Sequence, residues 1–120
     1  MPSAFSGETL DGSAVTRTLD ERTLIVAIKS SCDGCRAFVH SALEELKNVP
    51  VVIVSATKDL NHEWAHAPQA VIVAPDLLAA LDIRWPPTYV LIDSRRHEVV
   101  SEGVLFSPAQ VAGEIARFLT

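Results

Sequence analysis

The feature of this sequence that most constrains its fold is an apolar segment that leads into a pair of cysteines. Residues 23–28, TLIVAI, form an almost unbroken apolar run rich in β-branched side chains, as in strands that are covered on both faces. Cys32 and Cys35 follow at what should be the first turn of a helix, and they are the 2 cysteines of the chain. Two cysteines this close in sequence cannot join distant parts of a fold, so the motif indicates a redox site or half of a metal site.

The start of a helix favours thiol chemistry at the first cysteine. A helix N-terminus carries partial positive charge and free N–H groups, which stabilise the Cys32 thiolate. The thiolate is the form that attacks a disulfide, so this arrangement is typical of a redox site. Three charged neighbours are expected to modulate the thiolate: Asp33 disfavours it, whereas Lys29 and Arg36 favour it.

Length and charge argue against several other classes of protein. A chain of 120 residues fits one domain over 1–120, which can bury roughly two thirds of its unfolded surface without a metal or disulfide staple. Its net charge of −5 disfavours a nucleic-acid surface, and no apolar stretch is long enough to span a membrane. The N-terminus has neither a basic start nor an apolar core, so we expect a cytoplasmic protein, or an extracytoplasmic one if a leader has been removed. We also expect a monomer.

The first half of the chain predicts a hairpin followed by a parallel unit. Asp11-Gly12 lies between short alternating segments, which favours a β-hairpin over residues 5–18. Apolar residues at helical spacing then predict a helix over 33–48, and a β-branched strand follows over 51–54. A strand-helix-strand order of this kind predicts a right-handed crossover between two parallel strands.

The second half predicts shorter elements. In chain order these are a helix over 57–67, a strand over 70–73, a helix over 76–81 after Pro75, antiparallel strands over 88–92 and 98–101, and a last helix that begins after Ser107. Ser107 can cap that helix through its hydroxyl group, and Pro108 suits its first position. The expected buried stripe of the last helix comprises Val111, Ile115, Phe118 and Leu119.

Taken together, these motifs resemble the thioredoxin-like superfamily, in particular its redoxin branch of small thiol-disulfide oxidoreductases. The resemblance covers nearly the whole chain and implies an α/β fold: a three-layer sandwich with a central mixed β-sheet, helices on both faces and an N-terminal β-hairpin. The residues that carry it are Phe5 and Thr9-Leu10-Asp11-Gly12 at the hairpin, Cys32-Asp33-Gly34-Cys35 after the strand, Asp76-Leu77 and Leu81-Asp82-Ile83, Pro86-Pro87-Thr88-Tyr89-Val90-Leu91-Ile92-Asp93, and Gly103.

The family implies a role for each part of the site. Cys32 would be the exposed nucleophile and Cys35 the resolving thiol in disulfide exchange with protein partners. The family has a cis-proline before the corresponding strand, which here is Pro87, and Trp85, Pro86 and Pro87 would line the substrate groove. The dithiol carries the electrons, so no cofactor is implied, but an unidentified redox partner must recycle it.

Three positions depart from the family pattern. Val26 stands where many members have a buried aspartate that accepts the proton of the resolving thiol, so water or another group must take that role. Ser31 replaces the tryptophan that usually precedes the nucleophile, which removes an aromatic wall. Pro86 has no N–H to offer the substrate backbone, so we expect weaker or differently oriented pairing, with Trp85 supplying apolar contact instead.

Two alternatives use the same residues differently. A zinc site could combine Cys32 and Cys35 with His62 and His66, and His62-Glu63-Trp64-Ala65-His66 also matches the H-E-x-x-H motif of metallopeptidases. We expect no metal, because no second cysteine pair exists, and we expect His62 and His66 to lie on a solvated helix surface. The other alternative is a thioredoxin-like binding or accessory module whose C-x-x-C motif is a redox-sensitive contact.

Overall fold

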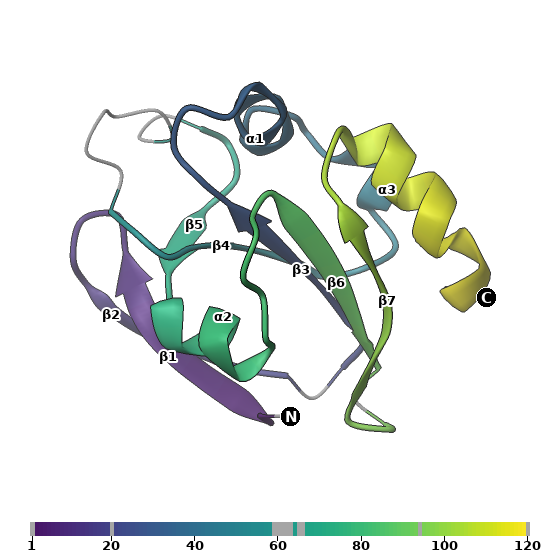
Figure 1. The fold of residues 1–120 in the computed structure, drawn as a ribbon, viewed down its shortest axis with the longest axis horizontal. Helices are drawn as coiled ribbons and strands as arrows, with labels where there is room; N and C mark the ends of the chain where they lie inside the picture. Colours follow the sequence, from purple (N-terminus) through teal and green to yellow (C-terminus); the bar gives the residue numbers. More distant parts are fainter. Residues whose placement is uncertain (1, 20, 59–63, 65–66, 94, 120) are drawn as a thin grey trace.

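The structure, a computed structural model, describes residues 2–19, 21–58, 64, 67–93 and 95–119. These residues form a mixed sheet of 7 strands in the order β2-β1-β5-β4-β3-β6-β7 (Figure 1). The strands are β1 (Ala4–Thr9), β2 (Ala14–Thr18), β3 (Thr23–Ile28), β4 (Val51–Ser55), β5 (Val71–Val73), β6 (Thr88–Asp93) and β7 (Glu98–Val104). The helices found in the same ranges are α1 (Asp33–Val39), α2 (Pro75–Ala80) and α3 (Pro108–Ile115), with short 3-10 turns η1 (Glu44–Leu46) and η2 (Ala116–Phe118).

The directions of the strands confirm the expected topology. β3, β4 and β5 run parallel, whereas β6 pairs antiparallel with β3 and β7 pairs antiparallel with β6. β1 and β2 form the predicted N-terminal hairpin, and β1 joins the sheet antiparallel to β5. Gly12 has a φ of 90° in the turn, a left-handed conformation that favours glycine. The Asp11-Gly12 pair therefore marks the hairpin because its glycine can adopt this conformation.

β3 is buried on both faces because helices cover both sides of the sheet. Leu24, Val26 and Ile28 belong to a core that includes residues of α1 and α3, whereas Ile25 and Ala27 belong to a second core that includes residues of α2. Figure 1 shows α2 apart from α1 and α3. Successive side chains of a strand point to opposite faces, so the unbroken apolar run follows from the position of β3 between two helix layers. The predicted three-layer α/β sandwich is confirmed.

The helix predicted over 33–48 is wrong in its second half. α1 ends at Val39, and η1 forms separately after Leu43, whose φ of 56° is left-handed. Ser41 contributes to this break, because its hydroxyl group accepts a hydrogen bond from the backbone N–H of Leu43 (3.0 Å) that competes with helical bonding. Leu43 and Leu46 are nevertheless buried in the core that includes α1. Their apolar spacing therefore reflects tertiary burial and not a continuous helix.

Apart from the segment 57–67, the other predicted elements are found with small shifts of their ends. α3 has the predicted cap, in which Ser107 Oγ accepts a hydrogen bond from the backbone N–H of the third helical residue. Val111 and Ile115 are fully buried as predicted, but Phe118 and Leu119 are only half-buried. The reason is that α3 ends at Ile115 and the tighter η2 follows, which rotates the last residues away from the helical stripe.

The segment 57–67, expected to be a helix, lies mostly outside the described residues. Among the helices that the structure describes, none combines the length and the apolar character that crossing a bilayer requires.

Two glycines allow a direct test of the packing between β1 and β5. A Cβ on Gly7 would lie 2.6 Å from the backbone oxygen of Val73, whereas a Cβ on Gly113 of α3 would meet no atom within 4 Å. We therefore expect Gly7→Ala to destabilise the protein by about 1–3 kcal/mol, because β1 must move away from β5. The matched variant Gly113→Ala should stabilise the protein by about 0.5–1 kcal/mol, because alanine favours the helical conformation more than glycine does at this exposed position. Urea unfolding measures both effects, and equal midpoints for the two variants would contradict this packing.

Candidate active site

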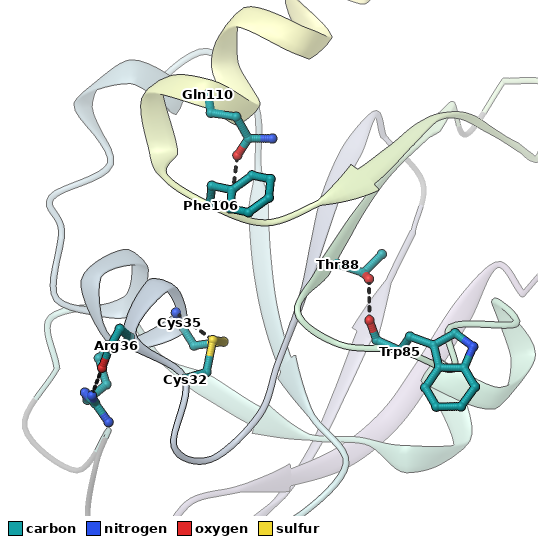
Figure 2. Close-up of a disulfide and its surroundings, with 8 residues drawn as sticks. Cys32, Cys35, Arg36, Trp85, Thr88, Phe106 and Gln110 are labelled. Atoms are coloured by element: carbon teal, nitrogen blue, oxygen red, sulfur yellow. Dashed lines mark hydrogen bonds and ion pairs between the residues drawn. A yellow bond between two sulfur atoms is a disulfide. The ribbon is translucent and has the colours of Figure 1, made fainter.

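Three segments that are distant in sequence meet at the edge of the sheet where β3 ends. In the pairing of β3 with β6, Ala27 lies opposite Thr88, so the residue before Thr88 emerges beside the end of β3. In the pairing of β6 with β7, Thr88 lies opposite Val104, so the chain leaves β7 at the same edge. The C-x-x-C motif, the segment from Trp85 to Thr88 that contains the Pro86-Pro87 peptide, and the loop between β7 and α3 are therefore neighbours (Figure 2).

Cys32 and Cys35 form a disulfide at the start of α1, with their Cα atoms 5.2 Å apart. Cys32 is the N-cap residue, and its sulfur accepts a hydrogen bond from the backbone N–H of Cys35 (3.2 Å). Cys35 is fully buried, whereas Cys32 is partly exposed. Of the two cysteines, Cys32 is the accessible one, which agrees with the order of attack that the family resemblance implies.

Ser31 shapes the entry into α1. Its φ of 58° is left-handed, which is uncommon for residues other than glycine, asparagine and aspartate. This bend turns the chain between the end of β3 and the helix that Cys32 caps. Serine has no strong preference for this conformation, so the sequence carries no signal for it.

The charged neighbours of Cys32 lie at the surface. Asp33 and Arg36 form an ion pair across one turn of α1, and their side chains are 95% and 43% exposed. Exposed pairs of this kind produce a weak field, because solvent screens both charges. Lys29 is also exposed, directly after β3. The modulation of the thiolate by Lys29, Asp33 and Arg36 stays a prediction, whereas the hydrogen bond from Cys35 to the sulfur is present.

The peptide bond between Pro86 and Pro87 is cis, as the resemblance implies. The carbonyl oxygen of Pro87 accepts a hydrogen bond from the N–H of Leu105 (3.2 Å), and Thr88 Oγ1 donates to the carbonyl oxygen of Trp85 (2.9 Å). These bonds hold the last residues of the loop before β6. The Trp85 side chain is 84% exposed, and its ring points away from the disulfide in Figure 2. A substrate groove lined by Trp85, Pro86 and Pro87 stays a prediction.

The loop between β7 and the N-cap Ser107, residues 105–106 (the β7–α3 loop), is a part of the site that the sequence did not indicate. A Cβ on Gly34, between the two cysteines, would lie 3.4 Å from the carbonyl oxygen of Phe106 and 3.5 Å from that of Leu105. The backbone of this loop therefore contacts the first turn of α1. Phe106 is 70% exposed at this position. The sequence signal is a large apolar residue directly before the cap Ser107, but such residues commonly pack against their own helix.

Behind the β7–α3 loop, Tyr89 of β6 reaches across β7 to Glu114 of α3. Its hydroxyl group donates a hydrogen bond to Glu114 Oε1 (2.6 Å). Gly103 leaves room for this contact, since a Cβ there would lie 3.0 Å from Tyr89 Cε1 and 3.1 Å from Glu114 Oε1. Burial, followed by the hydrogen bond to Glu114, raises the pKa of Tyr89, and the same bond lowers the pKa of Glu114. Gly103, one of the residues that carry the resemblance, thus permits a link between the sheet and α3.

The metal alternatives rest partly on residues without a described position. His62, Glu63 and His66 of the H-E-x-x-H motif lie outside the described residues. Within the described part of the chain, no group of three or more His, Cys, Asp and Glu side chains is arranged to hold an ion.

Comparisons with known proteins identify the fold. No protein-family model matches the chain, and no curated protein matches it in sequence. An exposed lipoprotein thioredoxin from Streptococcus pneumoniae has a TM-score of 0.68 at 18% identity, over 97% of this chain and 97% of that one. A secreted disulfide oxidoreductase from Mycobacterium tuberculosis gives 0.66 at 14% identity, over 94% and 95% of the two chains. A thiol:disulfide interchange protein of the thioredoxin family from Chlorobium tepidum gives 0.68 at 19% identity, over 98% and 94%. These likenesses show that the chain has the thioredoxin-like fold.

The hydrogen bond between Tyr89 and Glu114 predicts a pH-dependent contribution to stability. Because this bond lowers the pKa of Glu114, the ionised carboxylate stabilises the folded state at neutral pH, and this stabilisation is lost as the pH falls through the folded-state pKa. The pKa of Tyr89 is raised, so the protonated hydroxyl group also stabilises the folded state. This stabilisation is lost as the pH rises from the pKa of an ordinary tyrosine through the raised pKa of Tyr89.

We therefore expect Tyr89→Phe to unfold at a lower temperature than the wild type at neutral pH. The difference should shrink as the pH falls through the lowered pKa of Glu114, because the carboxylate then takes up a proton. Thermal unfolding followed by circular dichroism at neutral and acidic pH measures the difference. A gap between the two proteins that does not change with pH would show that the hydroxyl group acts through packing alone.

Proposed function

We propose that this chain is a thiol-disulfide oxidoreductase that exchanges disulfides with protein partners through Cys32 and Cys35. The observation that carries the proposal is the disulfide at the start of α1, in which Cys32 is partly exposed and Cys35 is fully buried. The cis peptide bond before β6 lies at the same edge of the sheet. Neighbours described as a disulfide oxidoreductase and a thiol:disulfide interchange protein support the same activity.

In the direction of substrate reduction, the Cys32 thiolate attacks one sulfur of the substrate disulfide. That S–S bond breaks, a mixed disulfide between Cys32 and the substrate forms, and the other substrate sulfur leaves as a thiolate. Cys35 then loses its proton and attacks Cys32 Sγ, which forms the Cys32–Cys35 disulfide and releases the second substrate thiolate. Two electrons have then moved from the dithiol to the substrate, and both substrate thiolates take up protons. The reverse sequence oxidises a substrate dithiol, and an external dithiol or disulfide partner resets the site.

Two features of the site bear on these steps: what stabilises the Cys32 thiolate, and where the proton of Cys35 goes. The N–H of Cys35 lies within hydrogen-bonding distance of Cys32 Sγ (3.2 Å) and stabilises a thiolate there after reduction. Val26, where many family members have an aspartate, is fully buried among apolar side chains and cannot accept a proton. The proton of Cys35 therefore goes to water or to the thiolate that the substrate has released.

We also propose that residues 1–120 act as a single domain and as a monomer, without a cofactor. The net charge of −5 makes nucleic acid an unsuitable partner. For the compartment, one neighbour is an exposed lipoprotein and another is a secreted oxidoreductase. Both support a location outside the cytoplasm, in place of the cytoplasmic location expected from the N-terminus. Disulfides persist in such oxidising compartments.

Cysteine variants test the proposed chemistry. Cys35→Ser should accumulate mixed disulfides with partner proteins, because the resolving thiol is missing. Cys32→Ser should accumulate none and should reduce insulin no faster than dithiothreitol alone, because the nucleophile is missing. Non-reducing gels detect the trapped species, and the turbidity of precipitating insulin chains measures turnover. The double variant Cys32→Ser/Cys35→Ser controls for thiol-independent association.

The competing function is that of a thioredoxin-like accessory module. Pro86 has no backbone N–H to pair with a substrate, and a module without turnover would not need one. A wild-type protein that is folded but does not accelerate insulin reduction, together with a Cys35→Ser variant that traps no protein, would favour this module. Binding of equimolar zinc by the reduced protein, lost in Cys32→Ser, would favour its zinc-binding form.

A further inference from the structure

Gln110, the third residue of α3, holds the β7–α3 loop through its side-chain amide. Its Oε1 accepts hydrogen bonds from the backbone N–H groups of Phe106 (2.9 Å) and Ser107 (3.2 Å). Its Nε2 donates to the carbonyl oxygen of Val104 (2.9 Å) and to Glu114 Oε2 (2.5 Å). One side chain therefore binds the backbone at both ends of this short loop. A helix cap requires only the bond to Ser107, so the bonds to Phe106 and Val104 are additional.

The same loop contacts both other segments of the redox site. The N–H of Leu105 donates to the carbonyl oxygen of Pro87 (3.2 Å). The carbonyl oxygens of Leu105 and Phe106 lie against Gly34 of the C-x-x-C motif. Figure 2 shows the loop between Gln110 and the disulfide. The position of the loop relative to the disulfide is therefore set on one side by Pro87 and on the other by Gln110.

Phe106 exposes an apolar ring at a place where a helix start usually hides one. A hydrophobic residue directly before an N-cap commonly packs against the fourth helical residue, which here is Val111. Val111 is fully buried by other residues, and Phe106 is instead 70% exposed. Because Gln110 binds the Phe106 N–H, the ring projects from a backbone that is held in place. Aromatic rings presented in this way are frequent anchors in protein recognition.

We propose that Gln110 is a positioning residue for disulfide exchange, which holds Phe106 beside the C-x-x-C motif so that its ring contacts an apolar side chain next to the cysteine of a protein substrate. This inference rests on the proposed function and names a feature of its substrates. A small disulfide without neighbouring side chains gains little from the contact. The redox chemistry itself stays with Cys32 and Cys35.

The test compares two substrates, insulin and hydroxyethyl disulfide, in Phe106→Ala, Gln110→Ala and the double variant. We expect kcat/KM for insulin to fall about fivefold to tenfold in each single variant, less than for a fully buried aromatic anchor, because the contact lies at an exposed ring. The rate with hydroxyethyl disulfide should fall much less. The double variant should match Phe106→Ala alone, because Gln110 acts through Phe106 and the two effects do not add.

Ser107→Ala is the matched control. It removes the hydrogen bond from the Gln110 N–H to Ser107 Oγ (3.1 Å) and leaves the bonds from the Gln110 side chain to the loop. It should lower the melting temperature, as Gln110→Ala does, without changing the insulin kinetics. An equal loss of insulin reduction in Ser107→Ala would show that Gln110 acts only by capping α3, and would overturn the proposal. Additive losses in the double variant, or normal insulin kinetics in Phe106→Ala, would overturn it as well. A wild-type protein that reduces neither substrate would contradict the proposed function, and this inference with it.

Discussion

The burial of β3 on both faces is the constraint on which the rest of this structure depends. All 6 residues of β3 are buried, and each large apolar side chain removed from water contributes roughly 1.5–3 kcal/mol. A slip of one residue in its pairing would exchange the two faces of the strand and mismatch both helix layers. The register with β6 is therefore fixed, and with it the position of the Pro86-Pro87 peptide beside the end of β3. The candidate redox site is assembled where this strand ends.

Backbone hydrogen bonds organise the site more than charges do. The sulfur of Cys32 accepts from a backbone N–H, and the carbonyl oxygen of Pro87 accepts from the N–H of Leu105. The charged pair beside the cysteines, Asp33 and Arg36, is exposed, so solvent screens both charges. The geometry of this edge thus follows from the fold of the main chain, which solvent and salt perturb little.

Local patterns in the sequence predict most of the sheet, the hairpin turn at Asp11-Gly12 and the position of the cysteines. Buried strands and tight turns require particular residue types at particular spacings, and these are visible in the sequence. The extent of α1 is not predicted, since Leu43 and Leu46 keep helical spacing while a left-handed residue breaks the helix. The β7–α3 loop is not predicted either. Its contacts with Gly34 and Pro87 join residues that are far apart along the chain and share no pattern.

Two departures from the family pattern are consistent with the proposed role of the β7–α3 loop in substrate recognition. Pro86 offers no N–H for pairing with a substrate backbone, and Ser31 offers no aromatic wall beside Cys32. The Trp85 ring points away from the disulfide (Figure 2). Among the described residues, Phe106 is the other strongly exposed aromatic side chain, and its backbone is held beside the motif. In the proposed mechanism, recognition therefore moves from main-chain pairing to a side-chain contact. Since the backbone of the loop is held before the substrate arrives, little additional ordering is needed on binding.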